Sequence, residues 1–210
     1  MLTHLLYLHG FRSSPHSAKA RRMALWAAAQ PGLHWACPQL PPGPQAAMDL
    51  IDRLTASWPT ASTAVVGSSL GGYYATALAE RRGWRGVLFN PAVEPARDLA
   101  RQIGPQTCWH DPELAFEFTA EHVAQLQALR PPQHLRQHYL AVIAKGDEVL
   151  DWREMQARYR EQQLLLLEGG DHGLTDFEPL IPAVEAFLLG ENAAPCLPSL
   201  TTPGSSSPAA

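Results

Sequence analysis

Short apolar runs alternate with longer, helix-like segments through most of the sequence. Each run is five to seven residues long, and most are bounded by Gly, Pro, Asn or a charged residue, which is typical of strands buried on both faces of a sheet. The runs occupy residues 2–8, 33–37, 63–67, 86–90, 138–144 and 163–167. Segments with apolar residues at mostly helical spacing lie between or after them, at 17–29, 45–58, 70–82, 151–161 and 176–189. This alternation predicts an α/β fold.

Repeated strand–helix–strand units predict a mostly parallel sheet of about six strands with helices on both faces. A parallel crossover needs a connection of a dozen or so residues, and the helix-like segments supply it. Ligands of such sheets bind at the carboxyl ends of the strands. The residues that follow each apolar run are therefore the candidates for chemistry.

Residues 91–132 interrupt the alternation, because the segment is longer than one crossover and contains a helical run at 119–129. It is either a lid or cap insertion over the site or two helices packed on the sheet. The chain length predicts a single domain over residues 1–190. Residues 191–210 are rich in Pro and Ser and lack periodicity, which predicts a disordered tail.

The composition excludes several classes of protein. A formal charge of −4 with 17% charged residues gives no basic surface for nucleic acid. No apolar run approaches the roughly 20 residues that a membrane-spanning helix needs. The first residues resemble a strand rather than a signal peptide, so we expect a cytoplasmic protein. Cys37, Cys108 and Cys196 are odd in number and far apart, which favours neither a disulfide framework nor a zinc site.

The segment 67–71, GSSLG, fits the pattern G-x-S-x-G with Ser69 at its centre. The pattern alone is weak, but here it follows an apolar run and opens a helix, the setting in which a sharp turn projects a nucleophilic serine. The flanking glycines lack Cβ atoms that would collide with the neighbouring strand and helix. A phosphate-binding turn is disfavoured, because the glycine spacing is not G-x-G-x-x-G. Ser69 is the predicted nucleophile, and Ser68 a turn residue.

A serine nucleophile needs a base, and the base needs an acid to orient it. In the order Ser, acid, His, only His172 follows the last central apolar run, in the loop GGDHG. Asp147 follows the run at 138–144 and is the predicted acid. Asp151 is its rival but is better explained as a helix N-cap, and Asp171 is disfavoured because adjacent residues rarely face each other.

The developing oxyanion needs N–H donors. Leu70 would supply one at the start of the helix after Ser69, and Phe11, in the loop after the first apolar run, would supply the other. Gly10 lets this loop approach the substrate, and His9 is expected to brace it. Arg12 either contacts an acidic or phosphorylated part of a substrate or is a solvated side chain at the rim. His9, Gly10 and Arg12 are thus candidate substrate-binding residues.

Five separated blocks of this sequence together resemble the YqiA-like family of small bacterial α/β-hydrolase esterases. They are YLHGFRSSPHSAKA from Tyr7, GSSLGGYYAT from Gly67, NPAVEP from Asn90, KGDEVLDWR from Lys145 and EGGDHGLTDFE from Glu168. The resemblance implies an α/β-hydrolase fold with Ser69, Asp147 and His172 as the catalytic triad. It further implies hydrolysis of carboxylic esters or thioesters, including acyl-CoA thioesters.

We therefore expect a serine hydrolase that acts on a small ester or thioester through an acyl-enzyme, without a metal or an organic cofactor. Two alternatives stay open. One is an acyltransferase that uses the same residues and passes the acyl group to an acceptor other than water. The other is a non-catalytic α/β protein that keeps the pocket for binding.

Overall fold

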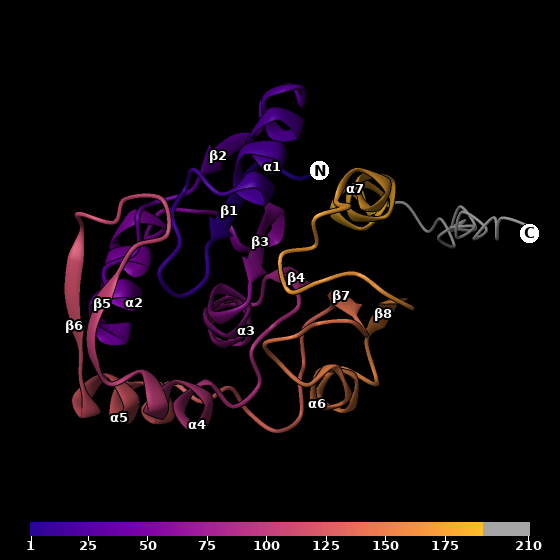
Figure 1. Ribbon diagram of the computed structural model, residues 1–210. Helices are drawn as coiled ribbons and strands as arrows, with labels where there is room; N and C mark the ends of the chain where they lie inside the picture. The colour runs from indigo at the N-terminus through magenta and orange to yellow at the C-terminus, as the bar shows by residue number, and fades with distance from the viewer. Residues whose placement is uncertain (191–210) are drawn as a thin grey trace, which may run out of the picture.

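Six parallel strands form the central sheet in the computed structural model, which describes residues 1–190 (Figure 1). Each neighbouring pair in the sheet is parallel. From edge to edge the strands are β2 (His34–Ala36), β1 (His4–Leu8), β3 (Thr63–Ser68), β4 (Arg85–Phe89), β7 (Tyr139–Ala144) and β8 (Gln163–Leu167). The predicted fold class is confirmed. The predicted disordered tail, 191–210, lies outside the described residues.

Helices cover both faces of this sheet, and Figure 1 shows the two layers on opposite sides of it. One layer consists of α1 (Ala18–Ala28) and α7 (Ile181–Leu189). The other consists of α2 (Pro44–Leu54), α3 (Leu70–Arg82) and α6 (Trp152–Arg158). The buried apolar side chains accordingly form two clusters, one between the sheet and each layer.

Strand β1 illustrates why the apolar runs located the strands. Leu5 and Tyr7 pack in the cluster under α1 and α7, whereas Leu6 and Leu8 pack in the cluster on the opposite face. All four residues are fully buried. A strand covered on both faces needs apolar residues at every position, so the sequence marks its limits to within one or two residues.

Some helices are shorter than the sequence predicts. The helix expected at 45–58 ends at Leu54, where the Thr55 hydroxyl donates to the Ile51 carbonyl at 2.8 Å, and the 3-10 turn η1 (Thr60–Ser62) follows. The helix expected at 176–189 begins with the 3-10 turn η3 (Glu178–Leu180), since Pro182 fits only the first turn of an α-helix. Among residues 1–190, none of the helices is long and apolar enough to cross a membrane.

The segment 91–132 contains a β-hairpin that the sequence analysis did not predict. Helix α4 (Pro95–Leu99) and the turn η2 (Ala100–Gln102) lead into the antiparallel strands β5 (Gly104–Thr107) and β6 (Ala115–Phe118), and α5 (Ala120–Ala128) follows. Helix α5 packs against α2 and α4, and the Leu126 carbonyl accepts a hydrogen bond from the Tyr73 hydroxyl at 2.7 Å. The insertion therefore stands beside the α2–α3 layer (Figure 1).

Candidate active site

Ser69 lies in a tight turn between β3 and α3, at the carboxyl edge of the sheet. Its φ of 55° and ψ of −122° are uncommon for a residue with a side chain and cost about 1–3 kcal/mol. Close packing on both sides holds the turn: a Cβ on Gly67 would lie 2.3 Å from the Gly71 oxygen, and one on Gly71 would lie 2.0 Å from the Leu8 oxygen. The two glycines of the pattern are thus required by steric contacts.

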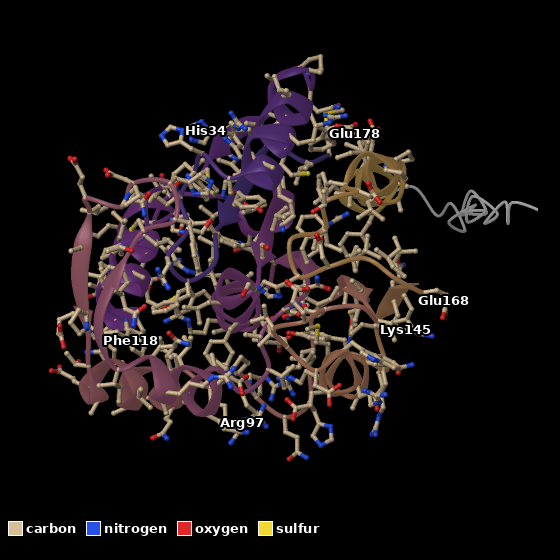
Figure 2. All side chains as sticks on the ribbon, in the orientation of Figure 1. His34, Arg97, Phe118, Lys145, Glu168 and Glu178 are labelled. Carbon is tan, nitrogen blue, oxygen red and sulfur yellow. The ribbon has the colours of Figure 1, made fainter. Side chains whose placement is uncertain are left out.

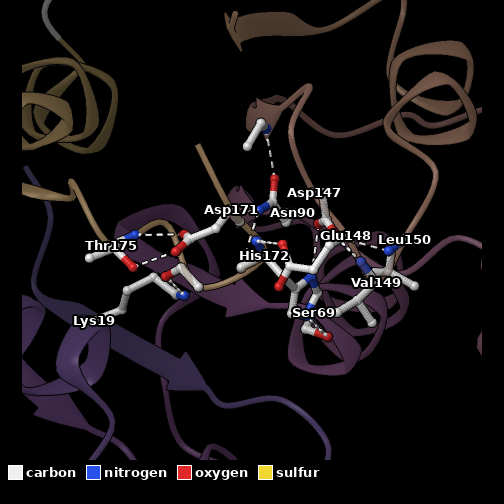
Figure 3. A network of polar contacts seen from close by, with 12 residues as sticks. Lys19, Ser69, Asn90, Asp147, Glu148, Val149, Leu150, Asp171, His172 and Thr175 are labelled. Carbon is white, nitrogen blue, oxygen red and sulfur yellow. Dashed lines mark hydrogen bonds and ion pairs between the residues drawn. The ribbon is translucent and has the colours of Figure 1, made fainter. Parts of the chain in front are cut away.

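His172 lies between Ser69 and Asp147 (Figure 3). Its Nε2 is 3.0 Å from Ser69 Oγ, and its Nδ1 is 2.8 Å from Asp147 Oδ2. A carboxylate can only accept, so Nδ1 carries the proton and Nε2 is free to accept from the serine hydroxyl. The Asp147 side chain is 0% exposed and that of His172 is 21% exposed, so the carboxylate is buried behind a partly exposed ring.

The second oxygen of Asp147 is also bound, because Oδ1 accepts from the N–H groups of Val149 and Leu150, each at 2.8 Å. Asp151 instead caps α6, accepting from the Arg153 N–H at 2.9 Å. Asp171 accepts from the N–H and hydroxyl of Thr175. Of the three aspartates weighed in the sequence, only Asp147 contacts His172.

The loops that carry Asp147 and His172 start side by side at the ends of β7 and β8. The Lys145 N–H donates to the Leu167 carbonyl at 2.9 Å, and the Gly146 N–H donates to the Gly169 carbonyl at 3.3 Å. The side chains of Lys145 and Glu168 pair at 2.7 Å on the outer edge, where Figure 2 labels both. Main-chain contacts therefore extend the sheet pairing into both loops.

Three side chains to which the sequence reasoning assigned no role hold the His172 loop: Asn90, Glu148 and Lys19. Glu148 Oε2 accepts from the His172 N–H at 3.0 Å, and the Lys19 ammonium donates to the Gly173 carbonyl. Burial lowers the pKa of Lys19 to about 8, although the charges of Asp171 and Asp147 oppose this shift. These contacts connect segments that are distant in the sequence, so no local sequence pattern predicts them.

The main-chain N–H groups of Phe11 and Leu70 have no acceptor within residues 1–190. Leu70 is the first residue of α3, so the positive end of the helix dipole adds to its N–H. The loop after β1 reaches the serine closely, because a Cβ on Gly10 would lie 3.1 Å from Ser69 Cβ. Leu70 follows Ser69 in the chain, Phe11 follows Gly10, and all four residues line one pocket.

His9 is 4% exposed and braces the loop after β1. Its Nε2 accepts from the Leu40 N–H at 3.0 Å, so the proton must be on Nδ1, which donates to the Gly10 carbonyl at 3.0 Å. Burial holds the pKa of His9 below its ordinary value, which keeps the ring neutral. Both ring nitrogens are occupied, and His9 therefore supports the chain rather than exchanging protons.

Arg12 connects the loop after β1 to the hairpin. Its Nε donates to the Thr107 carbonyl at 2.7 Å, and its guanidinium carbon lies 4.0 Å from the centre of the Trp109 ring. The main-chain N–H of Trp109 in turn donates to the main-chain carbonyl of Arg12 at 2.8 Å. The ring of Phe11 packs edge-on against Phe118 of β6, with centroids 5.0 Å apart. Residues 11 and 12 are thus both attached to the hairpin.

A pocket of about 320 Å³ opens beside Ser69 and His172. Its walls come from the loop after β1, from α4 and η2, from the hairpin and from the loop after β7. The apolar lining residues include Phe11, Leu70, Pro95, Leu99, Trp109 and Leu150, and the polar ones include Lys19, Asp98, Arg101 and Gln102. Within residues 1–190, no cluster of three or more His, Cys, Asp or Glu side chains is placed to hold a metal ion.

Solved structures with the same fold include known hydrolases. Alpha/beta hydrolase domain-containing protein 10 from mouse has a TM-score of 0.70 at 13% identity, covering 89% of this chain and 90% of that one. Est1E from Butyrivibrio proteoclasticus, with ferulic acid bound, has a TM-score of 0.70 at 14% identity, with 90% and 88% covered. A metagenome-derived lipolytic enzyme, from work on LipS and LipT, has a TM-score of 0.65 at 19% identity, with 89% and 93% covered. The chain therefore has the α/β-hydrolase fold.

A family model described as an uncharacterised protein family, UPF0227, matches residues 4–189. The match begins with β1 and ends with α7, so it includes every strand and helix described above. It also contains all five sequence blocks on which the resemblance was drawn. The chain belongs to UPF0227, the YqiA family.

Proposed function

We propose that the protein is a serine hydrolase that cleaves carboxylic ester or thioester bonds through an acyl-enzyme intermediate. One observation carries the proposal: Ser69 Oγ, the His172 ring and the Asp147 carboxylate form a hydrogen-bonded chain that ends in a pocket. Such a chain lets a neutral imidazole remove the serine proton as the hydroxyl attacks. Ser69, His172 and Asp147 are then the catalytic triad.

Acylation begins when Ser69 Oγ forms a bond to the substrate carbonyl carbon and its proton moves to His172 Nε2. Asp147 holds the Nδ1–H of the ring and stabilises the imidazolium that results. The negative charge passes to the carbonyl oxygen, which the Phe11 and Leu70 N–H groups bind. The tetrahedral intermediate then collapses, the bond to the leaving group breaks, and His172 gives its proton to the departing alcohol or thiol.

Deacylation repeats these steps with water as the nucleophile. His172 Nε2 takes a proton from water as the oxygen attacks the acyl carbonyl, and the same two N–H groups bind the oxyanion. Collapse of the second tetrahedral intermediate breaks the bond to Ser69 Oγ, which recovers its proton from His172. The products are a carboxylic acid and the alcohol or thiol.

The pocket lining supports an apolar acyl group. Phe11, Leu70, Leu99 and Trp109 give the pocket beside Ser69 apolar walls, and Asp98 of α4 and Arg101 of η2 add charged groups to its lining. Apolar walls bind acyl chains by removing their surface from water. We propose that the acyl group of the substrate lies along the apolar walls. The substrate class implied by the family resemblance is esters and thioesters, including acyl-CoA thioesters.

Active-site labelling tests the proposal. A fluorophosphonate probe should label the wild-type protein and Ser68→Ala at Ser69, located by mass spectrometry, and should not label Ser69→Ala. Ser68 is a matched control because it is the neighbouring serine and also lines the pocket. Equal labelling of all three proteins, or of none, contradicts the hydrolase proposal and favours a binding protein. Transfer of the acyl group to an added alcohol or thiol, with no hydrolysis by water, would instead support the acyltransferase alternative.

A further inference from the structure

Asn90 joins the end of β7, three residues before Asp147, to the loop that carries His172. It follows β4 at the carboxyl edge of the sheet and is 1% exposed. Its Oδ1 accepts from the Ala144 N–H at 2.8 Å, and its Nδ2 donates to the carbonyls of Asp171 at 3.0 Å and His172 at 3.2 Å. Figure 3 shows Asn90 between the Asp147 turn and the His172 loop. One amide thus links the end of the strand that leads to Asp147 with the loop that carries His172.

The orientation of this amide is fixed by its partners. A main-chain N–H can only donate and a carbonyl can only accept, so the oxygen must face Ala144 and the nitrogen must face the His172 loop. The backbone at Asn90 is left-handed, with a φ of 41°, a conformation that Asn adopts more readily than most residues. Its own N–H donates to the Val142 carbonyl at 2.9 Å, which anchors it to β7.

The residues next to Asn90 hold the nucleophile. The Ser69 N–H donates to the Phe89 carbonyl at 3.0 Å, and the Ala92 N–H donates to the Ser69 carbonyl at 3.0 Å. Residues 89–92 therefore contact the main chain of Ser69 directly, and through Asn90 they also contact the end of β7 and the His172 loop.

We infer that Asn90 is a positioning residue that sets the distances between Ser69, His172 and Asp147; the inference rests on the proposed function. Asn90 does not line the pocket and touches none of the reacting atoms, so it acts through His172 and Asp147. Removing its amide leaves the carbonyls of Asp171 and His172 without this donor. Displacements of about 1 Å in such a site reduce turnover by about 10²-fold, so the ring does not need to leave the site to be affected.

Three substitutions separate the role of the amide from that of the backbone. Asn90→Gly keeps the left-handed backbone and removes the amide, and Asn90→Ala removes the amide at an unfavourable φ. Asn90→Asp keeps the side-chain shape and the acceptor for the Ala144 N–H, but it places a carboxylate oxygen against the carbonyl oxygens of Asp171 and His172. We expect kcat to fall about 10- to 100-fold in all three with KM changed by less than about threefold, because binding groups are untouched.

Thr55→Val is the matched control. Thr55 is fully buried at the C-terminal end of α2, its hydroxyl donates one hydrogen bond to the Ile51 carbonyl, and it does not line the pocket. This variant should lose stability while kcat is retained. Full activity in Asn90→Gly with loss only in Asn90→Ala would mean that the backbone conformation alone matters, and it would overturn the inference.

A double-mutant cycle tests whether Asn90 acts through His172. In a His172→Ala background, Asn90→Gly should have no further effect on the residual rate, whereas an effect as large as in the wild type would overturn the inference.

Amide hydrogen exchange gives a readout without activity: residues 169–175 should exchange faster in Asn90→Gly and Asn90→Asp than in Thr55→Val. Unchanged exchange there would also overturn it. If Ser69→Ala retains activity, the proposed function fails; if Ser69→Ala is inactive and Asn90→Gly is fully active, only this inference fails.

Discussion

Gly71 in α3 contacts the main-chain carbonyl of Leu8 so closely that a Cβ would lie 2.0 Å from the carbonyl oxygen. The contact fixes the distance between the turn of Ser69 and the loop that carries Phe11. Helix α3 and strand β1 therefore meet through main-chain atoms, at the point where the proposed oxyanion donors must converge.

Gly71→Ala should destabilise the protein and abolish the proposed esterase activity. The added methyl group must displace main-chain atoms, and overpacking of this kind costs about 1–3 kcal/mol or more. Urea unfolding should give a lower midpoint than the wild type. Gly169→Ala is the control, because a Cβ there meets nothing within 4 Å. Equal midpoints for Gly71→Ala and the wild type would contradict the steric account of the turn.

Asp147→Asn should lower kcat by about three to four powers of ten while the fold is retained, because the amide no longer holds the His172 tautomer that accepts the serine proton. Asp151→Asn provides the comparison. Asn is as good an N-cap as Asp, so this variant should keep both its stability and its kcat. Steady-state kinetics on an activated ester measures both. A large loss in Asp151→Asn with little loss in Asp147→Asn would reverse the assignment of the acid.

Arg12→Met should loosen the hairpin β5–β6 and lower kcat/KM. The guanidinium binds the Thr107 carbonyl and lies over Trp109, and Met can replace only the apolar part of these contacts. Hydrogen exchange of residues 104–118 should rise in the variant. Arg21→Met, which changes an exposed arginine of α1, should leave that exchange unchanged. Equal exchange in both variants would show that Arg12 does not tether the hairpin.

The partly buried Lys19 ammonium should make the stability of the protein depend on pH. The pKa of Lys19 falls from 10.5 to about 8 on folding. Below pH 8 the Lys19 ammonium is charged in both the folded and the unfolded state, and the folded state carries the full cost of desolvating that charge. Between pH 8 and 10.5 the unfolded state binds more protons than the folded state, so the free energy of unfolding rises with pH. Relative to Lys19→Met, the wild type should therefore gain on the order of 1 to 3 kcal/mol across this range.

Urea unfolding of both proteins at pH 7, 8, 9 and 10 measures the difference. Groups with raised pKa values, such as Cys37, are present in both proteins and cancel. A difference that is constant over this range would show that the Lys19 charge is not desolvated by the fold.

The central sheet could be predicted from the sequence because its inner strands β1, β3, β4 and β7 are buried on both faces, so most of their positions are apolar. The hairpin could not. Strand β5 has the sequence GPQT, which shows no apolar alternation, and the aromatic residues of β6 pack against Phe11, more than a hundred residues earlier in the chain. A strand that is stabilised by such distant contacts has a weak local pattern.

The same distinction applies to the candidate site. Ser69, Asp147 and His172 each follow a strand that the sequence marks clearly, so their order could be recognised and the structure brings them together. Asn90 also follows such a strand, but its partners are main-chain groups, which have no residue identity in the sequence. Lys19 and Glu148 bind main-chain groups of the His172 loop in the same way. Local patterns indicate side-chain chemistry and not the supports that orient it.

Strand β8 has one neighbour in the sheet, β7, and it is the strand that leads into the His172 loop, whereas Ser69 follows β3 in the middle of the sheet. Partial opening at an edge requires less free energy than global unfolding. Mild denaturant should therefore detach His172, the proposed base, while the turn of Ser69 persists, and the proposed activity should disappear at a lower urea concentration than the far-ultraviolet circular dichroism signal. The position of two residues in one sheet thus sets the order in which the protein loses activity and structure.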